Sequence, residues 1–357
     1  MSSAMMTQKK PKVSKYLTTP TRPVSVDRDR SVAGLLEKME GCGLGGRQLA
    51  EAHRIWLDML GDNTTIWVAA SGALVPAGMR RLLAYVIKNR FIDVLVLSGN
   101  VVFHDLHETL GRHHFQAHPS MPDEELEASN ITRTADMLVS NEELREAEEW
   151  VGGFANQLDP TRAFSTREFL HLMGRELAEI AGEDGLLTAA FKSRVPVFCP
   201  DIIDSSVGVG IAGMRYEKKN NFMFDLVQDV LDIMHIGAKA RVSGVINLGT
   251  GPSKSFVQLA EVSQYIMKSQ PRGHKYAITI TSDVPHPSSD LNANFNDDSL
   301  LFGKLAKGAT TAYVNCDATI ALPLVITALS QTAAKYMKGR KRPTFTFMAK
   351  DLTVEVP

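Results

Sequence analysis

Lys304 lies in a short apolar and aromatic stretch, Leu300 to Leu305, where a lysine could carry out covalent chemistry. Apolar surroundings disfavour an ammonium group, and the resulting neutral amine is a nucleophile that forms an imine with a carbonyl carbon. In the alternative interpretation, the side chain lies along apolar surface while its charged end reaches water. Spacing alone leaves both interpretations open.

Three turns of small residues follow apolar runs: Ser71-Gly72-Ala73, Ser98-Gly99-Asn100 and Gly249-Thr250-Gly251. Small residues allow the backbone to approach a phosphate or a ribose closely. The stretch from Gly249 to Ser255 lacks the GxxxxGK spacing of a P-loop, so we do not expect a triphosphate site. Gly208 to Gly213 matches GxGxxG, but no expected strand ends directly before it, so we interpret it as a glycine-rich loop.

Five of the 10 histidines lie close together in one segment of the chain: His104, His107, His113, His114 and His118. His107-Glu108 is not followed by a second histidine at the offset that a helical metal site requires. We therefore predict no metal site and interpret the segment as a solvated or interface helix.

Short apolar runs alternate with amphipathic stretches over most of the chain. We expect strands at 65–70, 91–97, 195–199, 242–248, 276–281 and 311–315, and helices at 164–192, 222–236, 253–268 and 320–338. A further helix is expected through Arg80, Leu83 and Val86. This alternation predicts an α/β fold: one large Rossmann-like domain with a mostly parallel sheet flanked by helices. Ligands in such folds bind at the carboxyl ends of the strands, where the three turns lie.

The predicted organisation is a mobile polar tail over 1–30, the α/β domain over 31–340 and a C-terminal extension over 341–357. Residues 121–159 are acidic, and we expect them to form an exposed, irregular insertion. The net charge of -1 on 357 residues gives no reason to expect nucleic acid or a membrane as a partner. No apolar run approaches the roughly 20 residues of a membrane span, and the 3 cysteines show no CxxC pairing, which favours a reducing, cytoplasmic compartment.

The run from Thr65 to Leu106 resembles the deoxyhypusine synthase family, most closely at Phe91-Ile92-Asp93-Val94-Leu95-Val96. Val195 to Pro200 and Asp204 to Gly208 resemble the next landmark of that family. Lys304 to Ala318 keeps the family's spacing from its catalytic lysine to an Asp-Ala pair. The resemblance extends over roughly residues 60–338 and implies a deoxyhypusine synthase-like fold.

The resemblance implies NAD-dependent amine transfer. NAD oxidises spermidine, a butylamine unit passes to an enzyme lysine as an imine, and a lysine of a translation factor accepts it. Lys304 would be the catalytic lysine. The implied cofactor-binding residues are Ser71, Gly72, Ser98, Gly99, Asp204, Asp317 and Ala318, and the implied substrate-pocket residues are Asp290, Asp298 and Phe302.

Several positions depart from the family pattern. Phe103 and His104 stand where the family has two adjacent glutamates, Val209 replaces an aspartate and Ser255 replaces a histidine. Each lost charged hydrogen bond to an ammonium group costs roughly 1.5–3 kcal/mol. Among the positions that bind the cofactor in the family, Thr250 replaces a glycine, Asp283 an alanine and Pro76 a serine.

Three functions are compatible with a chain that keeps the aligned lysine and several cofactor-binding residues but lacks most of the amine-binding ones. The first is a regulatory paralogue (a prozyme) that assembles with an active deoxyhypusine synthase paralogue. We expect this hetero-oligomer to be a tetramer and to act on the translation factor precursor. The second is a self-sufficient deoxyhypusine synthase or aminobutyl transferase, in which His104 replaces a lost carboxylate as an acid–base group. The third is an NAD-binding protein without transferase activity.

Overall fold

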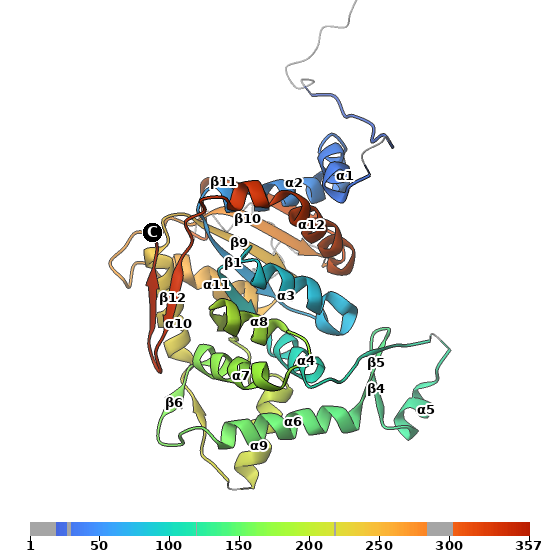
Figure 1. The fold of residues 1–357 in the computed structure, drawn as a ribbon, viewed down its shortest axis with the longest axis vertical. Helices are drawn as coiled ribbons and strands as arrows, with labels where there is room; N and C mark the ends of the chain where they lie inside the picture. The colour runs from blue at the N-terminus through green and yellow to red at the C-terminus, as the bar shows by residue number, and fades with distance from the viewer. Residues whose placement is uncertain (1–18, 27–29, 119, 218, 284–302) are drawn as a thin grey trace, which may run out of the picture.

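The computed structural model of the chain describes residues 19–26, 30–118, 120–217, 219–283 and 303–357 (Figure 1). Most of the predicted polar tail lies outside this part of the chain, as do Asp290, Asp298 and Phe302. No helix within the described residues is long and apolar enough to cross a membrane.

A six-stranded sheet in the order β11-β10-β9-β1-β2-β7 forms the centre of the fold, and all of its strand pairs are parallel. Its strands are β1 (Thr65–Ala70), β2 (Val94–Leu97), β7 (Val197–Phe198), β9 (Ser243–Leu248), β10 (His274–Thr281) and β11 (Leu305–Asn315). The predicted α/β class with a parallel sheet is therefore confirmed. The carboxyl ends of all six strands share one edge of the sheet, which we call the carboxyl edge, and the opposite side is the amino edge.

Both faces of the sheet are buried, as the near-continuous apolar strands predict. Ile66, Val68 and Ala70 of β1 belong to the larger hydrophobic cluster, whereas Trp67 and Ala69 belong to a second cluster on the other side. Successive side chains of a strand point to opposite faces, so one strand supplies both cores.

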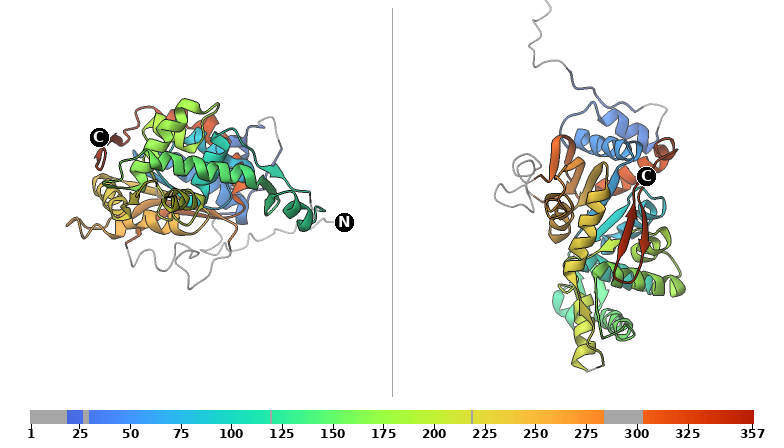
Figure 2. Two further views of the ribbon diagram at one scale, coloured as in Figure 1. Left: turned by 90° about the horizontal axis from the view of Figure 1, so that it is seen from below. Right: turned by 90° about the vertical axis from the view of Figure 1, so that its left-hand side faces the viewer.

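Helices cover the two faces unequally. The first face is covered by α1 (Val32–Met39), α2 (Leu44–Gly61), α3 (Arg80–Lys88), α8 (Leu186–Ser193), α12 (Ala318–Thr332) and the short α13 (Ala334–Met337). The second is covered by α10 (Leu226–Lys239) and α11 (Pro252–Val262). The C-terminal residues form the hairpin β12 (Thr344–Phe347) and β13 (Leu352–Glu355), which lies beside α10 (Figure 2).

The remaining elements are η1 (Val75–Met79), α4 (Gly99–Thr109), β3 (Phe115–Gln116), α5 (Asp123–Ala128), β4 (Ile131–Thr134), β5 (Met137–Ser140), α6 (Asn141–Asn156), β6 (Ala163–Phe164), α7 (Thr166–Ile180), α9 (Ser206–Tyr216) and β8 (Met223–Phe224). Except for η1, which follows β1 and contacts α3, α4 and α12, they lie beyond the β2–β7 side of the sheet (Figure 1). This list corrects two predictions from the sequence.

The expectation of an irregular insertion over residues 121–159 was wrong. The segment contains α5, the β4–β5 hairpin and the 16-residue helix α6. Ser140 caps α6 by accepting a hydrogen bond from the backbone of Glu143, and Ala147, Val151 and Phe154 are buried at helical spacing. The acidic residues that suggested a loop lie on the solvent face of an amphipathic helix.

The expected glycine-rich loop at Gly208 to Gly213 was also wrong, because these residues lie inside α9. A β-carbon on Gly210 would lie 2.3 Å from the carbonyl oxygen of Glu148, and one on Gly152 would lie 2.7 Å from that of Gly210. The glycines therefore allow α6 and α9 to cross in close contact, which compensates for their poor helix propensity.

Strand β11 contains an irregularity near its amino end. Leu305 pairs with His274, but Thr310 pairs with Tyr276. Between these two pairs β11 has more residues than β10, so the extra residues of β11 bulge outward. Beyond the bulge the register is regular as far as Asn315 opposite Thr281. The bulge separates the segment that carries Lys304 from the regular part of the strand.

A buried carboxylate connects the helices behind the carboxyl edge. Asp105 of α4 is fully buried and accepts hydrogen bonds from Arg80 Nε at 3.0 Å and from the backbone of Leu186 at 2.8 Å and Leu187 at 3.0 Å. It thereby joins α4 to α3 and satisfies two N–H groups in the first turn of α8. Arg80 also donates to Thr109 at 2.7 Å.

We predict that Asp105→Ala lowers the free energy of unfolding by about 3–5 kcal/mol, because it removes the nearest counter-ion of a buried guanidinium and leaves only Glu108, at 3.9 Å. Urea denaturation followed by circular dichroism measures this change. Asp136→Ala removes an exposed carboxylate and is the matched control, with an expected change within about 0.5 kcal/mol. Equal unfolding midpoints for the two variants would contradict the assigned role of Asp105.

Candidate functional site

A cavity of about 490 Å³ opens at the carboxyl edge, and we call it the carboxyl-edge pocket. Its walls come from the residues that follow β1, β9, β10 and β11. Of the seven residues predicted to bind a cofactor, it contains Ser71, Gly72, Asp317 and Ala318. The turns after four parallel strands therefore meet in one place, as the predicted topology requires.

The first turn is held by its neighbours on both sides. The backbone N–H of Ser71 donates to Leu248 at 3.0 Å, and its hydroxyl bonds Ser253 at 3.2 Å. Gly72 has a φ of 87° and Gly249 a φ of 79°, which are left-handed values that favour glycine. A β-carbon on Gly249 would lie 3.2 Å from the carbonyl oxygen of Ser71, so the two turns pack closely.

Two carboxylates fix the opposite wall. Asp317 caps α12 by accepting hydrogen bonds from the backbone N–H of Thr319 at 2.7 Å and from its hydroxyl. Asp283, which stands where the resembled family has alanine, accepts a short hydrogen bond from the hydroxyl of Thr250. Two of the three substitutions in the cofactor set, Thr250 and Asp283, therefore contact each other within the pocket.

The second turn lies beside the pocket and is held by a residue that the sequence did not single out. Asp201 accepts a hydrogen bond from the backbone N–H of Gly99 at 3.1 Å. Burial raises the pKa of Asp201, and the nearby carboxylate of Asp204 adds a smaller effect in the same direction. Ser98 occupies the N-cap position of α4 without a capping hydrogen bond from its side chain, and its hydroxyl is buried without a hydrogen-bond partner among the described residues. Asp204 is exposed on the loop before α9.

The tip of the β4–β5 hairpin also reaches the carboxyl-edge pocket. Ala135, Asp136 and Met137 line it, although they are more than 60 residues from the first turn in sequence. The backbone N–H of Ala117 donates to Asp136 at 2.8 Å and fixes the tip. No sequence signal indicated this contribution, since the segment was interpreted as an irregular insertion.

Lys304 lies at the amino edge, far from the carboxyl-edge pocket. Its carbonyl oxygen accepts a hydrogen bond from the backbone of His274 at 2.9 Å, at the first residue of β10. Thr281, the last residue of β10, lines the pocket. The seven residue steps between them span about 23 Å at 3.3 Å per residue. The described chain therefore does not bring Lys304 and the predicted cofactor residues together.

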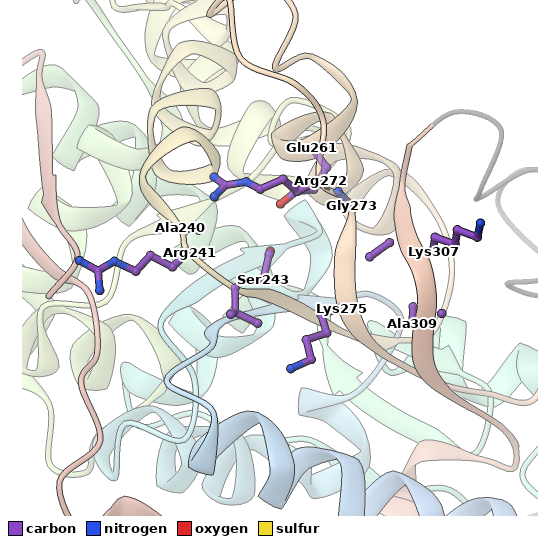
Figure 3. A pocket seen from close by; sticks show the side chains of 12 residues that line it. Ala240, Arg241, Ser243, Glu261, Arg272, Gly273, Lys275, Lys307 and Ala309 are labelled. Carbon is purple, nitrogen blue, oxygen red and sulfur yellow. Dashed lines mark hydrogen bonds between the residues drawn. The ribbon is translucent and has the colours of Figure 1, made fainter.

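A second cavity, of about 320 Å³, lies at the amino edge next to the bulge that follows Lys304 (Figure 3). Glu261 and Ser243 form its inner wall, and Lys307 and Ala309 belong to the bulge. Glu261 is 3% exposed and accepts a hydrogen bond from the backbone of Gly273 at 3.1 Å, while burial raises its pKa.

The four residues that replace amine-binding residues of the resembled family lie in different surroundings. Phe103 is 3% exposed and packs in the larger core, so its ring fills space where a carboxylate would be desolvated. Val209 is exposed on α9 and lines a separate cavity between α6 and α9. Ser255 is exposed on α11, across the sheet. His104 is half-buried beside two further histidines.

The histidine segment is more ordered than a solvated helix would be. His107 is fully buried on α4, and His114 Nδ1 lies 2.8 Å from Glu108 Oε1. Within the part of the chain that the structure describes, no group of three histidine, cysteine or acidic side chains is arranged to hold a metal ion.

Comparisons with known proteins agree with this architecture. The family model for deoxyhypusine synthase matches residues 34–329. A protein of Methanosarcina mazei named probable deoxyhypusine synthase 2 is 39% identical over 336 residues, covering 93% of this chain and 95% of its own. The same organism has a probable deoxyhypusine synthase 1, which is 31% identical over 323 residues, with 90% and 98% coverage.

Among solved structures, one from Entamoeba histolytica that is provisionally identified as a deoxyhypusine synthase superposes with a TM-score of 0.56. It is 18% identical and covers 87% of this chain and 97% of its own. At this identity the likeness supports the fold alone.

The second turn yields a testable prediction. A β-carbon on Gly99 would lie 2.6 Å from the hydroxyl of Ser205 and 3.0 Å from the carbonyl oxygen of Asp201. We therefore expect Gly99→Ala to destabilise the chain by about 1–3 kcal/mol through overpacking. Gly153→Ala, in open space on α6, is the control and should be neutral or stabilise by about 0.5–1 kcal/mol. Thermal unfolding of both variants measures the difference, and an unaffected Gly99→Ala would contradict the close packing.

Proposed function

Because this chain belongs to the deoxyhypusine synthase family, we propose that it is a catalytically impaired, cytoplasmic regulatory subunit of that enzyme. In this proposal it assembles with an active paralogue. It then activates the NAD-dependent transfer of the butylamine group of spermidine to a lysine of the hypusine-containing translation factor precursor.

The separation of Lys304 from the carboxyl-edge pocket, together with the replacements at Phe103 and His104, carries this proposal. The two lie at opposite ends of β10, about 23 Å apart by strand length, and a lysine side chain cannot cover that distance. A working site that uses both must combine the pocket of one chain with the lysine of another. An assembly of two unlike chains then contains two unlike sites.

The uneven losses indicate which of these two sites works. Phe103 and His104 lie on α4, which begins at the carboxyl edge, so the lost glutamates belong to the half that contains the pocket. Lys304 belongs to the other half. We infer that the better site combines the intact pocket of the active paralogue with Lys304 of this chain.

The carboxyl-edge pocket fits the dinucleotide that the family implies. Gly72 and Gly249 leave the backbone of two turns open, and Ser98 presents a buried hydroxyl that has no partner among the described residues. Asp317 and Asp283 are suited to ribose hydroxyls, and α4 and α12 both begin at this edge, where the positive end of a helix dipole favours phosphate. NAD bound there supplies hydride transfer.

The comparisons also support a paralogue pair. Methanosarcina mazei has two proteins of this family, and this chain is 39% identical to the one numbered 2 but 31% identical to the one numbered 1. Two copies in one organism provide the components that a mixed assembly requires.

We predict that the purified chain transfers little butylamine from labelled spermidine, and that adding it to its paralogue raises the paralogue's rate at least about tenfold, equivalent to about 1.4 kcal/mol in the barrier. Size-exclusion chromatography should show the two chains in one complex. High activity of the chain alone, or the absence of both association and stimulation, would contradict the regulatory role.

The contribution of Lys304 is tested in the mixed complex. Lys304→Ala should abolish most of the stimulated activity, because it removes the nucleophile of the better site. Lys307→Ala removes an exposed lysine from the adjacent bulge and serves as the control, with activity expected to stay near that of the unmodified complex. An undiminished rate with Lys304→Ala would show that Lys304 is not the nucleophile.

A second candidate is a self-sufficient enzyme that uses two copies of this chain. It is favoured by His104, which stands at the position of a lost glutamate and is hydrogen-bonded to another histidine. In this case the chain alone would transfer an amine group with NAD, so the activity measured without the paralogue separates the two candidates.

A further inference from the structure

We propose that the second cavity, at the amino edge of the sheet, binds the phosphate group of a small molecule and that Arg272 is its main ligand. We call it the amino-edge cavity. It shares no lining residue with the carboxyl-edge pocket, so it is a separate site. The inference goes beyond the proposed function and does not depend on it.

The lining of the amino-edge cavity is strongly cationic, in a chain whose net charge is -1. One of its 12 residues, Glu261, is acidic, and four are basic: Arg241, Arg272, Lys275 and Lys307. Four positive charges and one negative charge give the lining a net charge of +3. A concave surface with such an excess of one sign attracts ligands of the opposite sign, here anions.

The four cations are not equally available to a ligand. Lys275 already forms an ion pair with Asp62 at 2.6 Å. Figure 3 shows the side chain of Lys307 extending away from the other three. Arg241 and Arg272 are exposed, and neither forms an ion pair with a carboxylate of the described chain. These two guanidinium groups are therefore the ones that an anion in the cavity would meet.

The guanidinium group of Arg272 is anchored in place. Its Nη2 donates to the carbonyl oxygens of Gly237 at 3.4 Å and Ala238 at 3.2 Å, in the last turn of α10. The donors on Nε and Nη1 have no partner within the described ranges. Because the side chain is already held, a ligand that accepts from these donors loses less free energy to side-chain ordering.

A buried carboxylate fixes the loop that carries Arg272. Glu261 accepts a hydrogen bond from the backbone N–H of Gly273 at 3.1 Å. Burial raises the pKa of Glu261, and hydrogen bonds from the hydroxyl of Ser243 and from the backbone of Arg272 and Gly273 oppose this rise. The oxygens of Glu261 are thus occupied by groups of the protein, which makes this side chain a positioning group for the loop.

The size and composition of the amino-edge cavity favour a small phosphorylated molecule. Its volume of about 320 Å³ is near the lower end for ligand sites, which range over roughly 300–1,000 Å³. None of its 12 lining residues is aromatic, so nothing in the lining is suited to stacking against a base. Two guanidinium groups match the double negative charge and the several acceptor oxygens of a phosphate better than a single carboxylate.

The amino-edge cavity adjoins the backbone of Lys304. The carbonyl oxygen of Lys304 accepts from the backbone of His274, and a β-carbon on Gly273 would lie 2.3 Å from the carbonyl carbon of Leu305. A ligand that immobilises Arg272 therefore also restrains the peptide that follows Lys304. Such restraint is measurable as slower exchange of backbone amide hydrogens.

The test measures binding of inorganic pyrophosphate to the full chain at low ionic strength, by isothermal titration calorimetry. Arg272→Gln should weaken binding about tenfold, because it removes charge-assisted hydrogen bonds. Arg272→Lys keeps the charge but has fewer donors, and should weaken binding about threefold. Lys307→Gln removes the same charge from the same lining and is the matched control, with affinity expected to stay within about twofold.

Two further measurements locate the site and identify the ligand class. With pyrophosphate bound, hydrogen exchange should slow at residues 272–275 and 304–306 and stay unchanged at 71–73, in the first turn of the carboxyl-edge pocket. Ribose 5-phosphate should also bind, whereas malonate, which carries two carboxylates, should bind about tenfold more weakly than ribose 5-phosphate.

Four outcomes overturn the inference. They are equal losses of affinity in Arg272→Gln and Lys307→Gln, which would indicate only diffuse attraction of anions, protection from exchange confined to residues 71–73, malonate binding as tightly as ribose 5-phosphate, and no pyrophosphate binding by the unmodified chain up to about 10 mM. Because binding is measured without turnover, failure to stimulate the paralogue would contradict the proposed function and leave this inference standing.

Discussion

The buried carboxylate of Asp105 is the interaction on which the carboxyl-edge site depends. It pairs with Arg80 of α3, satisfies the first turn of α8 and belongs to α4, so three helices from distant parts of the sequence share one charge. A charge taken out of water in this way is tolerated only with well-placed partners, which restricts how the three helices can pack. The second turn and His104 both lie on α4, and their positions follow from this arrangement.

Tight backbone contacts extend this restriction to the neighbouring elements. Gly99 lies against Ser205 and Asp201, so the start of α4 cannot move without the segment before α9. The close crossing of α6 and α9 at Gly152 and Gly210 then fixes the helix that follows the β4–β5 hairpin. In this way a small number of close contacts relate the hairpin tip, the second turn and the His104–His114 pair to one another.

Much of the fold could be predicted from the sequence because the strands are short, apolar and buried on both faces. The run Thr65–Ala70 and the turn Ser71-Gly72 were located correctly for this reason. The helix at Gly208 to Gly213 was missed because glycine has low helix propensity, and only the tertiary contact with α6 explains its use there. Residues 121–159 were misjudged because acidic composition outweighed the spacing of Ala147, Val151 and Phe154.

The site was predictable only in part, and for a related reason. Turns after strands carry a local signal, so Ser71 and Gly72 could be named in advance, and Asp317 could be named from the family resemblance. Asp201, Asp136 and the pairing of His114 with His104 depend instead on contacts between distant segments. Periodicity and spacing do not encode such contacts. Likewise, the alignment of Lys304 with a catalytic lysine gave no indication that it lies at the amino edge.

The bulge in β11 has a consequence for how chains of this fold can associate. The outer strand of a sheet exposes unpaired N–H and C=O groups, which could join the sheet of another chain into a continuous ladder. Here the bulge distorts the amino half of β11, and the opposite outer strand, β7, has only two residues. Neither border of the sheet offers a long, regular template, so subunits of this fold would meet through their helices and loops rather than by sharing strands.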